Sequence, residues 1–312
     1  MTIRKVENLD QFVEATVPRL PAEFLTINQD RIEQYIRRSD ALMVRSSKVL
    51  VSGGQRIRQA FFDFYKEASA VAATLDPLRT SALPLLMQPI AEDLSILSRV
   101  VHGETVDAMK THLDLVVDNQ SDFFTTFVSS GTGQLRSIFG NATELLDIAS
   151  SYSADLIGLA QGGLTGRILN RVNNVVKLAA LGAGPDEFTS VSLINQALGG
   201  PLEWSYQAER IFMTETMRLH SMAMQVAGEE ADRFVKTDKI WRWSGISRKE
   251  HARISGQRVD VRGKFRVPLR EGGIVRMRFP RDPGVARYPS AVINCGCSMN
   301  FLPTQRNAAV AA

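Results

Sequence analysis

The apolar residues of the first two hundred positions recur at helical spacing. Two stripes stand out, each of which would occupy one face of a helix: Ile32, Tyr35, Ile36, Met43 and Leu50, then Leu83, Met87, Ile90, Leu94 and Leu97. Gly53 and Gly54 are predicted to break the first helix, with another over residues 55–74. Polar or Gly-rich runs at 119–122 and 129–133 are predicted to be loops. We therefore expect a helical body over residues 1–200.

A single long helix is predicted next, over residues 202–227, because this stretch has no internal Gly or Pro. One face of it carries an apolar stripe, which we interpret as core-facing: Phe212, Thr216, Leu219, Ala223 and Val226. Gly228 is suited to cap its C-terminus. We assign residues 201–235 to this connecting helix.

After residue 235 the pattern changes from helical spacing to short alternating runs. Residues 275–279 read Val-Arg-Met-Arg-Phe, which has the two-residue period of a strand. We predict a small β-containing, loop-rich module over 236–303 and a loose tail over 304–312. The fold class expected is α+β, and a protease is expected to cut near 229–239 and release a helical fragment.

Composition narrows the class of protein further. The sequence has no run of 18 apolar residues and no apolar segment near its N-terminus, so neither a membrane span nor a secretory signal is expected. We expect a soluble protein made in the cytoplasm, with no membrane partner.

Charge is distributed unevenly along the chain. The formal net charge is +4, but residues 240–312 carry +10 and the first 239 residues carry −6. A basic end on an acidic body favours an anionic partner, either nucleic acid or an acidic protein surface. The alternative is a solvated arginine-rich surface without a partner.

The arginines of this end are candidates for a phosphate-binding surface, since arginine gives salt-dependent affinity that does not depend on base sequence. They are Arg248, Arg253, Arg258, Arg262, Arg266, Arg276, Arg278, Arg281 and Arg287. Trp241 and Trp243 would share one face of a strand, which is a candidate for base stacking but favours the core. No base-reading motif is evident, so sequence-specific recognition is not expected.

The only two cysteines, Cys295 and Cys297, are too few for a disulfide framework. Together with His251 they supply ligand types suited to zinc. A tetrahedral site needs a fourth ligand, for which His220 and Asp282 are the candidates. The alternative is a histidine hydrogen-bonded to backbone beside two buried thiols, and a Cys295–Cys297 disulfide would be strained.

Four motifs occur in order between Trp204 and Pro303. The helix contains Arg210-Ile211 and Thr214-Glu215, and Trp241-Arg242-Trp243 follows. Then come Arg248, His251 and Gly256 in the spacing R-x-x-H-x-x-x-x-G. The last motif combines Pro280-Arg281-Asp282-Pro283 with Asn294-Cys295-Gly296-Cys297. This series resembles the phage Mu F-like head morphogenesis family of minor head proteins. Gly296 stands where many members have arginine, and Val292-Ile293 where some have histidine, which weakens an anion or metal site there.

The resemblance implies a structural protein of the virion head, made in the host cytoplasm and acting near the portal vertex in head assembly, DNA packaging or DNA delivery. Its expected partners are the portal or other head proteins. An alternative is a non-specific DNA-binding protein that is packaged and ejected with the genome. A transferase-like toxin module is the least favoured reading, because no phosphate-binding loop or catalytic triad is evident.

One face of the helix predicted over residues 202–227 helps to decide between an enzyme and a structural protein. Glu215 and Arg218 are three residues apart, so their side chains meet on one face. A catalytic Glu215 would belong to an enzyme, whereas a structural ion pair would hold the helix to the C-terminal module. We expect the ion pair, no catalytic residues, and no cofactor other than the zinc considered above.

Overall fold

The computed structural model describes residues 22–73, 83–127, 163–164, 166–171, 174, 201–233, 235–243, 245, 248–293 and 295–306. The protein is a mainly helical α+β structure, as the sequence pattern predicts. The predicted loop at 129–133 and most of the helical body expected between it and residue 200 lie outside the described residues.

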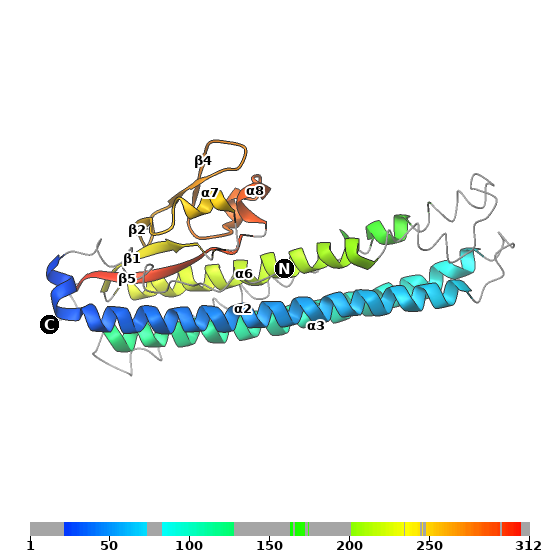
Figure 1. Ribbon diagram of the computed structural model, residues 1–312, viewed down its shortest axis with the longest axis horizontal. Helices are drawn as coiled ribbons and strands as arrows, with labels where there is room; N and C mark the ends of the chain where they lie inside the picture. Colours follow the sequence, from blue (N-terminus) through cyan, green and yellow to red (C-terminus); the bar gives the residue numbers. More distant parts are fainter. Residues whose placement is uncertain are drawn as a thin grey trace. The chain divides into compact units, whose positions relative to one another are not determined.

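Three long helices dominate the fold (Figure 1): α2 (Ala22–Ala73), α3 (Leu83–Phe127) and α6 (Pro201–Ala231). Each of them runs through a predicted interruption. Gly53 and Gly54 lie inside α2, residues 119–122 lie inside α3, and Gly228 lies inside α6, so these three predictions are wrong. Tertiary contacts can keep a glycine inside a helix where the local sequence pattern predicts a break. Gly53, described below, is an example.

The strands lie in the C-terminal region, as predicted. β1 (Val235–Arg242) pairs antiparallel with both β5 (Ser298–Arg306) and β2 (Arg258–Asp260), and β3 (Phe265–Pro268) pairs antiparallel with β4 (Ile274–Met277). Between them lie three short helices: α7 (Lys249–Ala252), η3 (Pro283–Val285) and α8 (Pro289–Val292). β5 continues to Arg306, so the tail predicted from residue 304 begins in a strand.

The chain forms two compact units that do not follow the predicted linear domains. Unit 1 combines Met1–Lys48, Met109–Ser151 and Thr214–Ala312, and unit 2 combines Val49–Ala108 and Tyr152–Met213. The predicted boundary near residue 235 therefore falls inside unit 1. Each long helix contributes one part to each unit.

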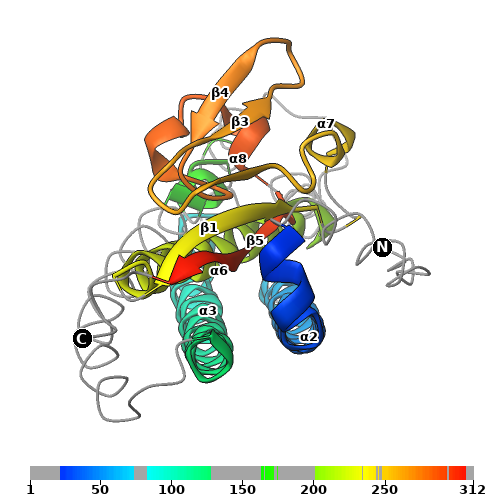
Figure 2. The ribbon, with the colours of Figure 1, turned by 90° about the vertical axis from the view of Figure 1, so that its left-hand side faces the viewer.

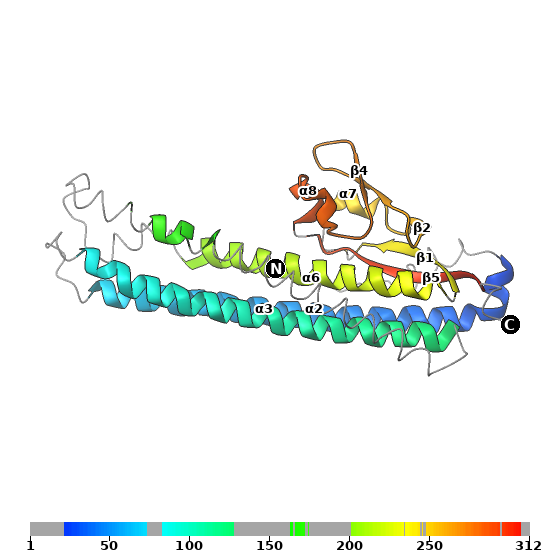
Figure 3. The same ribbon diagram turned by 180° about the vertical axis from the view of Figure 1, so that it is seen from behind.

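Within unit 1 the three-stranded sheet lies between the helices and the β3–β4 hairpin (Figures 2 and 3). Its core joins apolar side chains of all three helix segments to those of the strands, with Tyr35, Val116 and Met224 on the helices and Trp241 and Phe301 on the sheet. Trp241 is fully buried and Trp243 packs against the same core, so this tryptophan face is core.

Unit 2 has its own core where α2 and α6 approach closely. A Cβ atom on Gly53 would lie 2.5 Å from Cζ of Phe212, and one on Gly54 would lie 3.0 Å from the Glu209 carboxylate. Arg58 also donates to Glu209 at 2.6 Å. The glycine pair is thus needed for close helix packing, not for a turn.

None of the helices in the described ranges is both long enough and apolar enough to span a membrane.

Two glycines of unit 2 give a matched test of this packing. Gly53→Ala should lower the free energy of unfolding by about 1–3 kcal/mol because its methyl group overlaps Phe212. Gly103→Ala, on α3, should raise it by about 0.5–1 kcal/mol through helix propensity, because a Cβ atom there would meet nothing within 4 Å. Denaturant unfolding followed by circular dichroism measures both. Equal stabilisation by the two substitutions would contradict the close helix approach.

Candidate functional site

His251 lies on the short helix α7 and is held from several sides. Its backbone N–H donates to the carbonyl of Arg248 at 3.0 Å. Its ring packs edge-to-face with Trp241 of β1, with ring centroids 5.7 Å apart. Nε2 is buried without a hydrogen-bond partner among the described residues. The imidazole is therefore fixed in place with Nδ1 as its interacting nitrogen.

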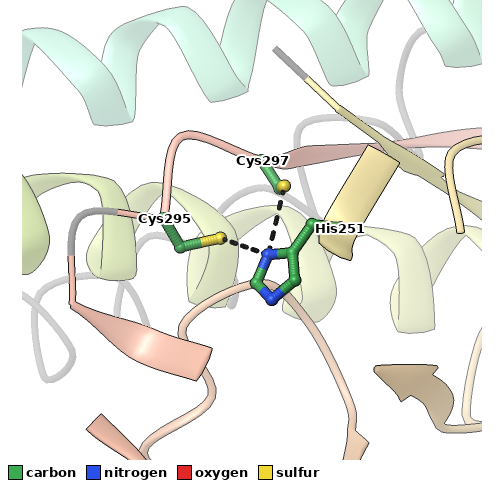
Figure 4. Close-up of side chains that lie close together, drawn as sticks. All are labelled: His251, Cys295 and Cys297. Atoms are coloured by element: carbon green, nitrogen blue, oxygen red, sulfur yellow. Dashed lines mark hydrogen bonds between the residues drawn. The ribbon is translucent and has the colours of Figure 1, made fainter. Parts of the chain in front are cut away.

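Nδ1 of His251 faces both cysteine sulfurs (Figure 4). It lies 3.4 Å from Sγ of Cys295 and 3.6 Å from Sγ of Cys297, both in the turn between α8 and β5. The exposed fractions are 0% for His251, 3% for Cys295 and 0% for Cys297, and the cysteines form no disulfide. The structure thus brings together the three residues that the sequence suggested as metal ligands.

The electrostatic surroundings favour a thiolate at this cluster. A hydrogen bond from Cys297 is the largest cause that holds the pKa of Cys295 well below its usual value. A hydrogen bond from His251 and the positive charge of Arg281 act in the same direction, while burial acts against it.

Arg281 is fully buried, so its assignment to a phosphate-binding surface is wrong. Its guanidinium donates to the carbonyl of Cys295 and, at 2.8 Å, to Oγ of Ser221 on α6. Its backbone has a φ of 67°, a left-handed conformation that a non-glycine residue rarely adopts. Burial lowers its pKa, and the thiols of Cys295 and Cys297 oppose that shift. No carboxylate in the described ranges forms an ion pair with it.

Glu215 and Arg218 form an ion pair on α6, and both side chains are mostly buried. Arg218 also donates through Nε to the backbone carbonyl of Arg281 at 3.2 Å. Burial raises the pKa of Glu215, and the charge of Arg218 lowers it. This arrangement links α6 to the segment after β4 and uses the carboxylate for a structural contact.

Neither candidate for a fourth metal ligand belongs to the cluster. Asp282 instead caps η3, where it accepts from the backbone N–H groups of Gly284 and Arg278 at 2.9 and 2.8 Å. His220 packs edge-to-face against His112 of α3, with ring centroids 5.5 Å apart. The set of close ligand atoms, all within 4.8 Å of one another, comprises His251, Cys295 and Cys297.

His112 and His220 form a second buried polar group of unit 1, which the sequence did not reveal. Oγ of Ser46 lies 3.1 Å from Nδ1 of His112. Burial lowers the pKa of His112 to about 4, with the charge of Arg281 acting in the same direction. Burial also holds the pKa of His220 well below its usual value. Both imidazoles are therefore neutral near neutral pH.

The other arginines of the candidate phosphate surface divide into two groups. Arg248, Arg258 and Arg278 have internal partners, respectively the carbonyl of Ile293 and the carboxylates of Asp238 and Glu229, although Arg278 remains exposed. The remaining five are exposed: Arg253, Arg262, Arg266, Arg276 and Arg287. Of these, Arg266 and Arg276 stand directly opposite each other on β3 and β4.

Lys239 is a further buried charge that sequence reasoning missed. It lies on β1 and donates to Oε1 of Gln225 at 2.8 Å and to the carbonyl of Arg278 at 2.6 Å. Burial lowers its pKa to about 8, and Arg278 adds to that shift. Lys239 shares one face of β1 with Thr237 and Trp241, which are both buried, and Trp241 two positions later was the available signal for a buried face.

In comparisons with known proteins, no family model, curated protein or solved structure matches the chain.

The ion pair on α6 predicts a loss of stability on neutralisation. Glu215→Gln should reduce the free energy of unfolding by about 3 kcal/mol, because it leaves a buried Arg218 without its countercharge. Glu230→Gln is the matched control, since the Glu230–Arg233 pair has the same spacing but exposes 64% of its arginine. That change should cost less than about 1 kcal/mol. Similar losses for both variants in denaturant unfolding would contradict a buried structural pair.

The buried histidines predict a pH dependence of stability. For His112 the pKa falls from 6.5 in the unfolded chain to about 4 in the folded protein. The unfolded state therefore takes up protons first, so stability is full above pH 6.5 and falls as the pH drops toward 4. His112→Asn should reduce this fall, and the exposed His102→Asn should leave it unchanged. Unfolding free energies across this pH range measure the slope, and an unchanged slope in His112→Asn would refute the assignment.

Proposed function

We propose that this chain is a minor head protein of a tailed phage, a structural component of the virion head that docks on other head proteins near the portal vertex. The proposal rests on the resemblance of residues 204–303 to the Mu F-like family. One observation carries it further: the separated pieces of that motif series meet in one buried network.

The network joins at least one residue of each motif by direct contacts, with Trp241 packed against the His251 ring. Arg218 on α6 pairs with Glu215 and donates to the backbone of Arg281. Arg281 donates to the backbone of Cys295, whose sulfur faces His251. Residues that are far apart in the chain but share one hydrogen-bond network depend on one another for folding. We expect such a network if the four motifs together mark the fold of a protein family.

The burial of these residues favours a structural role over an enzymatic one. A catalytic group must touch its substrate, and the polar groups here are occupied by one another. Glu215 is bound to Arg218, and His251 is enclosed by Trp241 and the cysteines. The transferase-like toxin reading, which needs an available Glu215, is for this reason the least favoured.

The exposed face of the β3–β4 hairpin is the surface we assign to an anionic partner. It carries Lys264, Arg266 and Arg276, while the alternate residues Phe265, Val267, Val275 and Met277 are buried. Like charges directly opposite on paired strands are destabilising. None of these three basic side chains has an ion-pair partner within the described ranges. An acidic surface of the portal or of another head protein would relieve that repulsion.

Phage DNA is the alternative partner for the same face, because phosphates satisfy arginine equally well. It corresponds to a protein that is packaged and ejected with the genome. Both readings place the mature protein in the virion head after synthesis in the host cytoplasm, without a membrane partner.

Co-purification with the portal protein of the encoding phage, at low and high salt, tests the proposal. We expect co-elution at low salt that weakens as salt rises, since charged contacts are screened. The double variant Arg266→Glu and Arg276→Glu should abolish it. Arg99→Glu and Lys110→Glu, at exposed positions of α3, make the same charge change and should leave it intact.

The outcomes separate the two readings. Retention of DNA without portal protein at any salt would replace the portal role with that of an ejected DNA-binding protein. Binding of neither partner by a folded protein would refute both readings of the hairpin face.

A further inference from the structure

We propose that His251, Cys295 and Cys297 bind one Zn²⁺ ion, which clamps α7 to the turn between α8 and β5. This site is independent of the proposed docking role, because it lies in the interior of unit 1 and requires no partner.

The spacing of the three ligand atoms fits a tetrahedral ion. With zinc–nitrogen bonds of about 2.0 Å and zinc–sulfur bonds of about 2.3 Å, neighbouring nitrogen and sulfur ligands lie about 3.5 Å apart. The observed separations of Nδ1 from the two sulfurs are 3.4 and 3.6 Å. All three ligand atoms lie within 4.8 Å of one another. An ion at their centre would have ordinary bond lengths with little movement of the side chains.

The type of donor selects the metal. Two sulfurs and one imidazole nitrogen form a soft to borderline set that suits zinc and does not suit Mg²⁺ or Ca²⁺, which prefer oxygen ligands. The three residues that contribute these atoms are almost completely buried, so water does not compete readily for the ion. His251 is also oriented in advance by Trp241, which reduces the entropy lost on binding.

The coordination would be completed from outside the protein. The three protein ligands leave one tetrahedral position, which a water molecule or another small ligand would fill.

A bound zinc ion would also stabilise the short helix α7. α7 is only four residues long, and no side chain caps its N-terminus. A metal bond between α7 and the segment before β5 would link residues separated by more than forty positions and stabilise both.

The first experiment is metal analysis of the full chain, made in zinc-supplemented medium and purified without chelator or metal-affinity tag. Mass spectrometry should find about one zinc ion per chain. Replacement of zinc by Co²⁺ should produce thiolate-to-cobalt absorption and the visible bands of a tetrahedral site. Cys297→Ser and His251→Gln should lose the zinc, whereas His102→Gln, which changes an exposed histidine of α3, should retain it.

A second measurement does not depend on the folding of the variants. Removal of zinc from the unaltered protein by a chelator should lower its melting temperature, and added zinc should restore it. A folded protein with less than about a tenth of a zinc ion per chain and no cobalt bands would overturn the proposal. Full retention of zinc by a folded Cys297→Ser protein would overturn it as well.

Discussion

A buried guanidinium that has no carboxylate partner among the described residues constrains the arrangement of unit 1. Transfer of a charge from water to a protein interior is costly unless hydrogen bonds and countercharge offset it. Arg281 meets that requirement with Ser221 of α6, the carbonyl of Cys295 and the adjacent thiols. The backbone of Arg281 is left-handed, which is unfavourable for arginine. The hydrogen bonds that its buried side chain needs hold the backbone in this conformation. Helix α6 and the turn that carries Cys295 are therefore both positioned around the guanidinium of Arg281, and His251 packs against that turn.

Contacts of Arg281 also cross the point where the composition of the chain changes. The sequence changes character near residue 235, and composition alone suggests a boundary there. Arg218 and Ser221 precede that point, and Arg281 and Cys295 follow it, yet they share hydrogen bonds. Lys239 adds another link, because its ammonium group binds Gln225 of α6. Contacts of this kind join segments far apart in sequence and leave no local pattern.

The local periodicity of the sequence was sufficient to predict the class of fold and the positions of several side chains. Alternation in residues 275–279 predicted a strand, and β4 occupies Ile274–Met277. The three-residue spacing of Glu215 and Arg218 predicted their pairing. Periodicity was insufficient for Gly53, because its helical position depends on the ring of Phe212 from a distant helix. The distribution of charge also grouped Arg281 with the surface arginines, because nothing adjacent to it in sequence reveals its hydrogen bonds to Ser221 and Cys295.

On the proposed function, the buried network and the basic hairpin have separate tasks. In that proposal the network would fix the module against α6, and the hairpin would present Arg266 and Arg276 to an anionic partner. A structural protein of a phage head needs rigidity and a contact surface, which these two features would supply. The proposed zinc ion would strengthen the rigid part and leave the contact surface unaltered.

On this structure, α6 and the β-containing region fold together as one unit around Arg281. Native-state hydrogen exchange in low denaturant, read by mass spectrometry, is the sharpest test of that unit. We expect the amides of residues 214–231, β1 and β5 to exchange through one shared opening with a single denaturant dependence. Exchange of β1 and β5 through an opening of lower free energy, while residues 214–231 stay protected, would contradict it.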